Sequence, residues 1–461
     1  MTNLTYDMFD FGDERLSERH QKILKTLSKD SQKAFPQVFK NNGELEGFYR
    51  FINNDRVQVN SLLDPFYRQT VQKLQGESAN RDIVVPHDTT LVSPKSNQNN
   101  LKGLNRTHGK HSAHGFFAHL SLAIEPKNRE ILGPLRLDMW TRRASKDEEK
   151  QKSESDRWFK NIEVSEISLG MPGRLIHVAD READSYNFYE KLVKKQYRFV
   201  IRNQHNRILN SETGEKLFDL LKSAPVLSTR EIELFKREQK LFKKSKNKIH
   251  PDRSKRTALL EISAVSVTLI YSPKRKKKDI PSSVDVNVVH VKETNPPAGE
   301  APIEWCLVTS EKIETASDVD QIIDWYRCRW VIEEFFKALK TGCSLEKRLF
   351  DEAHSWFRLV ALLVPIACKL YNLKTKSLLP AGQQDLKDLS TTQLEILKIS
   401  AFQNNRPLND AVDVLNEIAR LGGHIKYSGP PGWITLFRGM QELLTMEIGY
   451  KLRSAAICDR K

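Results

Sequence analysis

The sequence predicts an α/β protein with one mixed sheet flanked by helices, a β-rich insertion, and helical regions at both ends of the chain. Three observations carry this prediction. Apolar residues recur at helical spacing in residues 1–75, short apolar runs typical of strands follow from residue 83, and helical patterns return from residue 315. A chain of 461 residues is long enough for two to four domains.

The N-terminal 75 residues are expected to form a small basic helical unit. Its first helix has an apolar face, formed by Leu16, Ile23, Leu24 and Leu27. Two more helical stretches are expected at 45–52 and 60–74. Such a unit could dock on DNA or serve as a helical cap, and the pattern allows both.

The middle of the chain supplies the predicted sheet. Three successive strands are expected at 83–85, 118–125 and 131–140, and a polar helical stretch at 146–168. The run RLIHVAD is a buried strand ending at Asp180, because its apolar run is nearly continuous. A helix at 185–196 and a strand at 197–203 complete the order βββ-α-β-α-β.

Residues 205–312 interrupt this pattern. Short β-type segments alternate there with very basic loops, of which 236–256 and 274–278 are the densest. Solvated loops and contacts to phosphate explain these charges equally well. The region is therefore expected to be a β-rich insertion.

The charge balance favours a polyanionic partner. Lys and Arg total 74 against 59 acidic residues, which gives a net charge of +15. A soluble protein that happens to be basic is the alternative. The five cysteines form no close pair, which argues against a zinc site or disulfides and suits a reducing cytoplasm. No signal peptide and no apolar run of roughly 18–20 residues is recognised, so no membrane is expected.

The strongest local pattern is YRCRWVIEEFFKALK, residues 326–340, laid on one helix at roughly 100° per residue. Its apolar face carries Val331, Ile332, Phe335 and Leu339. The opposite stripe carries Tyr326, Arg329, Glu333 and Lys340, with Trp330 and Lys337 beside it. A solvated face of mixed charge is the ordinary explanation. Aromatic residues on the polar face, and cations flanking one acid, favour a phosphate backbone beside a metal ligand instead.

Two other acids fit the same site. Asp88 lies at or near a strand, and Asp180 ends one, where an open sheet presents its ligands. Glu182 and Asp184 compete with Asp180, although Asp184 or Ser185 is more simply a helix N-cap. Phosphodiester cleavage needs an activated water and a stabilised leaving oxygen, which two Mg²⁺ ions about 3.5–4 Å apart can supply. Three carboxylates suit two Mg²⁺ ions, with Mn²⁺ as a substitute.

These residues resemble a known group. HDTT (87–90), VADREADSY (178–186) and the spaced Tyr326, Arg329, Glu333 and Lys340 resemble the DDE transposases of the insertion-sequence-four family, in particular its Tn-five type. Residues 295–311 and 417–423 also fit that type. The likeness runs from about residue 47 to near the C-terminus.

The resemblance implies an RNase H-like catalytic domain that nicks transposon ends, forms and opens a hairpin, and transfers the 3′-OH strand into target DNA. It implies that Asp88, Asp180 and Glu333 are the metal ligands. Tyr326, Arg329 and Lys340 would contact transposon-end phosphates, and Arg202 would contact DNA. Trp305 would stack on a flipped base, although a core Trp in a strand is equally compatible with its local sequence.

The resemblance also implies an organisation. Residues 1–75 would bind the DNA ends, 76–365 would form the catalytic domain with its insertion at about 205–312, and 366–461 would dimerise. Double-stranded DNA and a second copy of the chain are the expected partners, in the cytoplasm of a bacterium near the nucleoid.

Two departures limit the resemblance. Gln204 stands where the type carries a basic residue, and the region before Gly47 matches only loosely. The cognate DNA sequence therefore does not follow from it. A junction resolvase with similar acids, and a DNA-binding regulator with an inactive site, are the alternatives; the retention of all three acids argues against the second.

Overall fold

The computed structural model describes residues 11–29, 33–39, 41–76, 81–94, 101–107, 113–142, 154–210, 212–234, 253–271, 281–376, 389–425 and 431–458. Its strands are β1 (Ile83–Val92), β2 (Asn105–Arg106), β3 (His114–Glu125), β4 (Glu130–Trp140), β5 (Leu175–Ala179), β6 (Arg198–Asn203), β7 (Val226–Leu234), β8 (Arg256–Ile270), β9 (Ser283–Glu293) and β10 (Glu304–Thr309).

Helices precede, separate and follow these strands. They are α1 (Glu14–Lys29), α2 (Phe35–Val38), α3 (Asn42–Ile52), α4 (Val59–Gly76), α5 (Glu154–Leu169), α6 (Tyr186–Lys194), α7 (Leu217–Ser223), α8 (Ala316–Arg327), α9 (Trp330–Lys337), α10 (Ala353–Lys376), α11 (Thr391–Gln403), α12 (Ala411–Leu421) and α13 (Trp433–Cys458). Short helical turns are η2 (Arg181–Ala183), η4 (Ala338–Gly342) and η5 (Leu345–Lys347).

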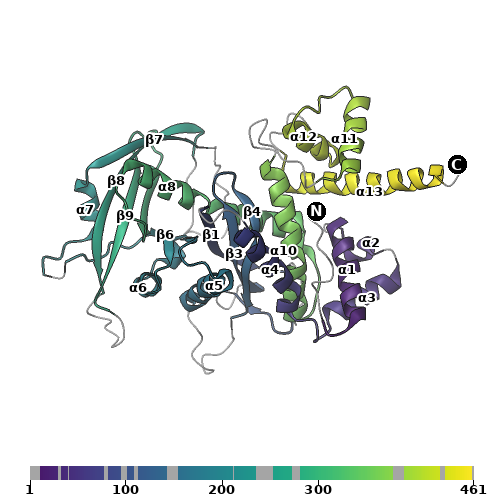
Figure 1. The fold of residues 1–461 in the computed structure, drawn as a ribbon, viewed down its shortest axis with the longest axis horizontal. Coiled ribbons are helices and arrows are strands. Elements are labelled where there is room, and N and C mark those ends of the chain that lie inside the picture. Colours follow the sequence, from purple (N-terminus) through teal and green to yellow (C-terminus); the bar gives the residue numbers. More distant parts are fainter. Residues whose placement is uncertain are drawn as a thin grey trace. The chain divides into compact units, whose positions relative to one another are not determined.

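The strands form one mixed sheet of ten, in the order β2-β3-β1-β5-β6-β10-β9-β8-β7, with β4 beside β3 (Figure 1). The pairs β1–β5 and β5–β6 are parallel, whereas β6–β10, β10–β9, β9–β8, β8–β7 and β3–β4 are antiparallel. The predicted α/β class with a mixed sheet and helices at both ends is confirmed. The strands expected in a β-rich insertion continue this same sheet, because β9 pairs with β10 along its length.

The chain divides into two compact units. The first comprises Met1–Ala79, Asp88–Gln151 and Trp330–Lys461, and the second comprises Asn80–His87 and Lys152–Arg329. Strand β1 passes from the second unit into the first between His87 and Asp88.

In the second unit, helices cover both faces of the sheet (Figure 1). Helix α8 packs Ile322 and Tyr326 against one face, in a core with Ile176 and Val178. Helices α5 and α6 cover the other face, where Trp158 and Tyr189 pack with Phe199 and Ile201. Neighbouring residues of one strand therefore point into different cores, as the two-residue period of a strand requires.

The N-terminal helices bury the face that the sequence predicts. Ile23, Leu24 and Leu27 of α1 are buried, and Leu16 is partly buried against the same core. The two further predicted helical stretches are α3 and α4. Of the two densest basic stretches, 274–278 lies outside the described residues, as does 236–256 up to residue 252.

Helix α10 is the central helix of the first unit's core. Its stretch Ala353–Asn372 is long and apolar enough to cross a membrane by length and composition, with a mean hydropathy of 1.3. The expectation that no such stretch exists was wrong. However, 72% of the most apolar window is buried inside the protein, because residues such as Trp356 and Leu363 pack against the other helices and strands. Core packing accounts for its apolar composition.

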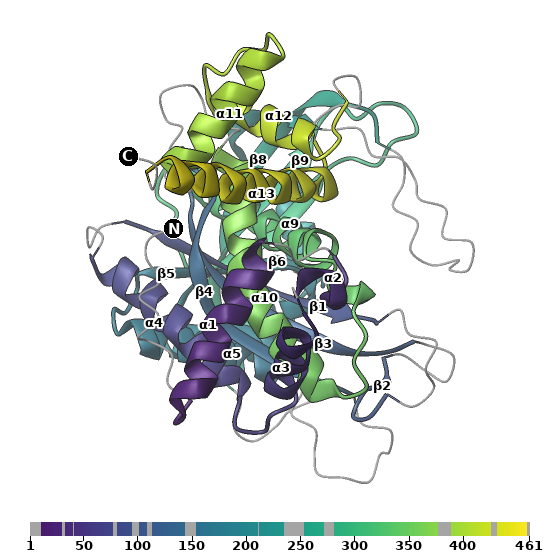
Figure 2. The same ribbon diagram turned by 90° about the vertical axis from the view of Figure 1, so that its right-hand side faces the viewer.

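The C-terminal helices α11, α12 and α13 pack together (Figure 2). Two glycines allow α12 and α13 to come close. A Cβ atom at Gly439 would lie 1.6 Å from the carbonyl oxygen of Ile418, and one at Gly422 would lie 1.9 Å from that of Thr435. Glu447 of α13 accepts hydrogen bonds from Ser390 (3.1 Å) and Gln393 (2.7 Å) at the start of α11.

Candidate active site

Asp88 lies in β1, two residues beyond Pro86, which pairs with Val178 of β5. Its side chain is half-buried, and one carboxylate oxygen accepts a hydrogen bond from the backbone N–H of Thr89 at 2.8 Å. The Thr89 hydroxyl lies 2.9 Å from Nδ1 of His119 on β3. These contacts hold the backbone at Asp88 while its carboxylate keeps access to solvent.

Asp180 directly follows β5, as predicted, and it too lies two residues beyond the Pro86–Val178 pair. It is half-buried and caps the short turn η2, where its Oδ1 accepts a hydrogen bond from the backbone N–H of Glu182 at 2.8 Å. The cap fixes the orientation of the carboxylate because the turn begins at this residue.

The competing acids beside Asp180 have different environments. Glu182 is exposed, whereas Asp184 is 6% exposed and holds the chain that follows β6. The donors to the Asp184 carboxylate are the backbone N–H groups of Gln204 and His205, the hydroxyl of Tyr189 and the guanidinium of Arg207. Helix α6 is capped by Ser185, whose hydroxyl accepts from Phe188 at 3.3 Å. Asp184 is therefore a structural acid.

Glu333 lies in the first turn of α9 and is half-buried. The neighbouring Glu334 is engaged elsewhere, because Lys337, Lys374 and the indole N–H of Trp433 contact its carboxylate. Burial alone would raise the pKa of Glu334, but these three contacts outweigh burial and lower it. The two adjacent glutamates are thus distinguished by their partners.

The described residues contain no group of three or more His, Cys, Asp and Glu side chains placed to hold a metal ion. Asp88 and Glu333 belong to the first unit and Asp180 belongs to the second. All three side chains are half-buried carboxylates. Their oxygen atoms are the kind of ligand that Mg²⁺ prefers.

Lys340 lies on η4 and reaches β1, where its ammonium donates to the backbone carbonyl of Leu91. Its Nζ lies 3.8 Å from Oε1 of Glu346. Burial lowers the pKa of Lys340, and the charges of Glu346 and Asp88 oppose that shift. The structure therefore brings two of the predicted site residues, Lys340 and Asp88, within electrostatic range of each other.

Four other predicted site residues form one group in the second unit, called here the aromatic–arginine cluster: Arg202, Trp305, Tyr326 and Arg329. The guanidinium of Arg329 lies 6.0 Å from the ring centre of Tyr326, and Arg202 donates to the carbonyl of Glu304 at 2.9 Å. Burial lowers the pKa of Arg202, with Tyr326 acting in the opposite direction.

The helix predicted over residues 326–340 is wrong in one respect, because it is broken. Helix α8 ends at Arg327 and α9 begins at Trp330. Tyr326 is 1% exposed, so it does not share a solvated stripe with Glu333. Trp330 is 39% exposed, as the polar-face prediction requires, and Lys337 is exposed beside Glu334.

Two regions of the chain match known protein families. Residues 3–57 match the family described as Transposase DNA-binding, and residues 170–364 match the Transposase DDE domain. The chain carries a transposase DNA-binding domain and a DDE transposase domain. Together they support a DNA transposase, an enzyme of the nuclease type whose partner is DNA.

The DDE domain implies an RNase H-like fold for the mixed sheet, in agreement with the sequence resemblance. Its matched range contains Asp180, Glu333 and the aromatic–arginine cluster, whereas Asp88 lies before it. The transposase DNA-binding domain covers α1, α2 and α3. Of the two roles that the sequence pattern left open for the N-terminal helices, the match supports DNA binding over residues 3–57.

A buried series of hydrogen-bonded side chains from β1, β5 and α5 was not predicted from the sequence. Nε2 of His87 lies 2.9 Å from Nδ1 of His177, and Nε2 of His177 lies 2.9 Å from Oε1 of Glu166 on α5. All three side chains are buried. His87 precedes Asp88 by one residue and His177 precedes Asp180 by three, which is the signal that could have identified them.

Proposed function

We propose that this DNA transposase cleaves transposon ends and joins their 3′-OH groups to target DNA, with Asp88, Asp180 and Glu333 as the ligands of two Mg²⁺ ions. The observation that carries this proposal is the match to a DDE transposase domain over residues 170–364, preceded by a transposase DNA-binding domain over residues 3–57.

The chemistry of the donors supports Mg²⁺ at these residues. The three acids are half-buried carboxylates, and hard divalent cations take oxygen ligands. Two such ions, when bound, would activate a water and stabilise the leaving oxygen of a phosphodiester. Asp88 and Asp180 each have one oxygen fixed by a backbone N–H, which orients the carboxylate before any ion binds.

The register of the parallel strands gives Asp88 and Asp180 equivalent places relative to the β1–β5 pairing. Each acid follows the Pro86–Val178 pair by two residues. Because side chains alternate along a strand, each acid shares a sheet face with Val84 or Val178, which pack in the core under α8. Glu333 comes from the helix that follows α8 after a break of two residues.

The cations near these acids support a phosphate backbone as the substrate. Lys340 would place its charge beside Asp88, and Arg329, which is buried beside Tyr326, would reach a phosphate only through the accessible edge of its guanidinium. Arg202 and the exposed Trp330 and Lys337 would contact DNA around them. Phosphate contacts of this kind position DNA without reading its sequence.

The finer steps rest on the sequence resemblance. A hairpin intermediate would use Trp305 to stack on a flipped base, and residues 366–461 would hold two copies together in a synaptic complex. The exposed residues on the C-terminal helices, such as Phe402 at 83%, support a partner surface there. A bacterial cytoplasmic location near the nucleoid is part of the same proposal.

To test this proposal, the protein is incubated with Mg²⁺ and with DNA that carries the termini of the transposon encoding it. Wild-type protein should yield nicked, hairpinned and joined products. Asp180→Asn, Asp88→Asn and Glu333→Gln should each abolish them. The neighbouring Glu182→Gln is the matched control, because it removes one exposed carboxylate two residues from Asp180 and should keep activity.

Wild-type cleavage by Asp180→Asn would show that the acids are wrongly assigned. Equal losses in Asp180→Asn and Glu182→Gln would point to a general effect of removing negative charge. Circular dichroism and unfolding curves on each variant separate loss of chemistry from loss of fold.

A further inference from the structure

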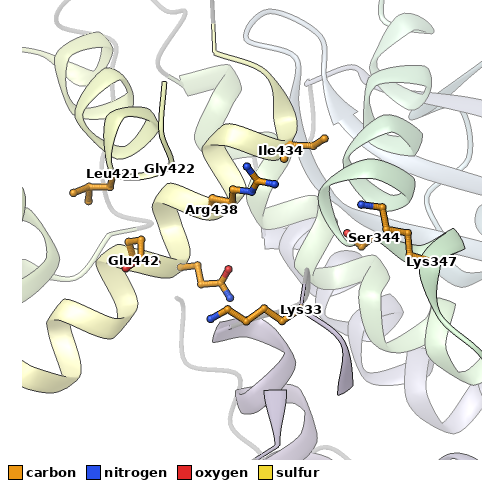
Figure 3. Close-up of a pocket in the computed structure, with 9 residues that line it drawn as sticks. Lys33, Ser344, Lys347, Leu421, Gly422, Ile434, Arg438 and Glu442 are labelled. Atoms are coloured by element: carbon orange, nitrogen blue, oxygen red, sulfur yellow. The ribbon is translucent and has the colours of Figure 1, made fainter. Parts of the chain in front are cut away.

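A basic hollow in the first unit is formed by segments that are distant in the sequence. It encloses about 350 Å³, and the residues that carry its polar character are Lys33, Ser344, Lys347, Arg438, Gln441 and Glu442. Lys33 lies in the segment before α2, Ser344 directly precedes η5, Lys347 ends η5, and the other three residues lie on α13 (Figure 3). The hollow is large enough for a phosphate group and its water.

The charges around this hollow are not balanced. Three cationic side chains line it with a single carboxylate, Glu442. Within the described part of the chain, neither Arg438 nor Lys347 forms an ion pair, and Glu442 pairs with neither. Arg438 and Lys347 therefore contribute a positive potential inside the hollow.

Gln441 supplies an independent observation that points to ligand binding. It is 7% exposed and lines the hollow, yet its amide Nε2 has no hydrogen-bond partner among the described residues. A buried donor left without an acceptor costs about 1–3 kcal/mol, so native proteins normally satisfy it. An N–H donor among cations is suited to an anionic oxygen.

We propose that this hollow binds a phosphate group of the DNA backbone, as a contact additional to the carboxylate site. Arg438 and Lys347 supply the charge, and the amide of Gln441 donates to a phosphate oxygen. Glu442 weakens the contact and keeps the site from holding anions too tightly. Because the phosphate is that of DNA, this inference rests on the proposed function.

A phosphate contact is independent of base sequence, so the test uses a short fluorescent duplex of arbitrary sequence. Binding is followed by fluorescence anisotropy between about 50 and 200 mM salt. Arg438→Gln should weaken binding by roughly three- to tenfold. It should also make the negative slope of log affinity against log salt less steep by about one. Gln441→Leu should weaken binding severalfold without changing the slope, and Glu442→Gln should strengthen it.

Lys398→Gln is the matched control, because it removes one exposed positive charge from α11. If Arg438→Gln and Lys398→Gln bind the duplex alike, the hollow does not bind DNA. If inorganic phosphate alone raises the Tm of wild-type protein but not of Arg438→Gln, and DNA affinity is unchanged, the site takes free phosphate and the proposal is overturned. The two proposals can fail separately. If the wild-type protein cleaves the ends of its transposon but Arg438→Gln binds DNA normally, phosphate binding at the hollow is refuted and the proposed function stands.

Discussion

The indole of Trp305 packs against the ring of Tyr326, with centroids 5.7 Å apart and planes inclined by 57°. Trp305 is 6% exposed and Tyr326 is 1% exposed, because β10 and α8 press them into one core. The sequence resemblance implies DNA-contacting roles for both residues. If the two residues contact DNA as we propose, either they rearrange locally or DNA reaches the edges that the core leaves accessible, and a substitution at this pair would change both stability and function.

Replacing Trp305 should therefore have two separable effects. Trp305→Ala should lower the free energy of unfolding by about 3–5 kcal/mol, because it leaves a cavity beside Tyr326. Trp305→Phe should fold nearly normally and should slow hairpin formation more than first-strand nicking, since a smaller ring stacks less well on a base. Gel assays of single-turnover reactions resolve the two steps. Equal slowing of nicking and hairpin formation by Trp305→Phe would remove the base-stacking role.

The acids of the DREAD segment should separate into structural and chemical ones. Asp184→Ala should destabilise the protein by about 3–5 kcal/mol, because it removes the carboxylate partner of the half-buried Arg207 and leaves two backbone N–H groups without their acceptor. Asp180→Asn should change stability by less than about 1 kcal/mol, since it keeps an oxygen to cap η2. Urea unfolding measures both. A large loss of stability in Asp180→Asn would mean that its carboxylate serves the fold.

Elements with a regular hydrophobic pattern, such as α1 and β5, are predicted from the sequence. The apolar face of α1 and the position of Asp180 at the end of β5 are both predicted, because each depends on a repeat within a few residues. The resemblance added an RNase H-like fold, which the family match supports. Local reasoning set Asp184 aside as a candidate helix N-cap. It could not predict that Asp184 is a buried acid bonded to Gln204, His205 and Arg207, because those partners lie beyond β6.

The break between α8 and α9 shows where such reasoning fails. The helical period continues through residues 326–340, so periodicity alone predicts one helix. The structure instead ends α8 at Arg327. The C-cap residue Cys328 donates its N–H to the carbonyls of Asp324 and Trp325, while Tyr326 packs against Trp305 on β10. Tertiary packing overrides a local pattern here. The joining of β9 to β10 likewise depends on long-range pairing that no local signal reports.

The stability contributions of the hydrogen-bonded side chains Glu166, His177 and His87 should depend on one another. The carboxylate of Glu166 accepts from Nε2 of His177, which lets Nδ1 of His177 accept from Nε2 of His87. Glu166→Leu should cost about 1–3 kcal/mol by leaving a buried donor unpaired. His177→Leu should cost about 3–5 kcal/mol by leaving a buried carboxylate.

The double variant Glu166→Leu/His177→Leu should lose less stability than the sum of the two, with a coupling energy of about 0.5–3 kcal/mol. Urea unfolding of the four proteins supplies the cycle. Strictly additive losses would mean that the contact contributes nothing beyond the burial of each side chain.

His20 should make the first unit sensitive to acid. It lies between Phe11 and Phe51, with ring centroids 5.2 and 5.9 Å away, and burial lowers its pKa to about 3. The unfolded pKa is about 6.5, so between these values the unfolded chain binds more protons than the folded one. Stability is thus fully present above about pH 6.5 and falls by about 1.4 kcal/mol per pH unit below it. His20→Phe should remove this share of the loss, whereas the exposed His205→Gln should not.

Urea unfolding at about pH 7 and about pH 5 measures how steeply the free energy of unfolding falls with pH. If His20→Phe falls as steeply as the wild type, His20 does not contribute to the acid sensitivity.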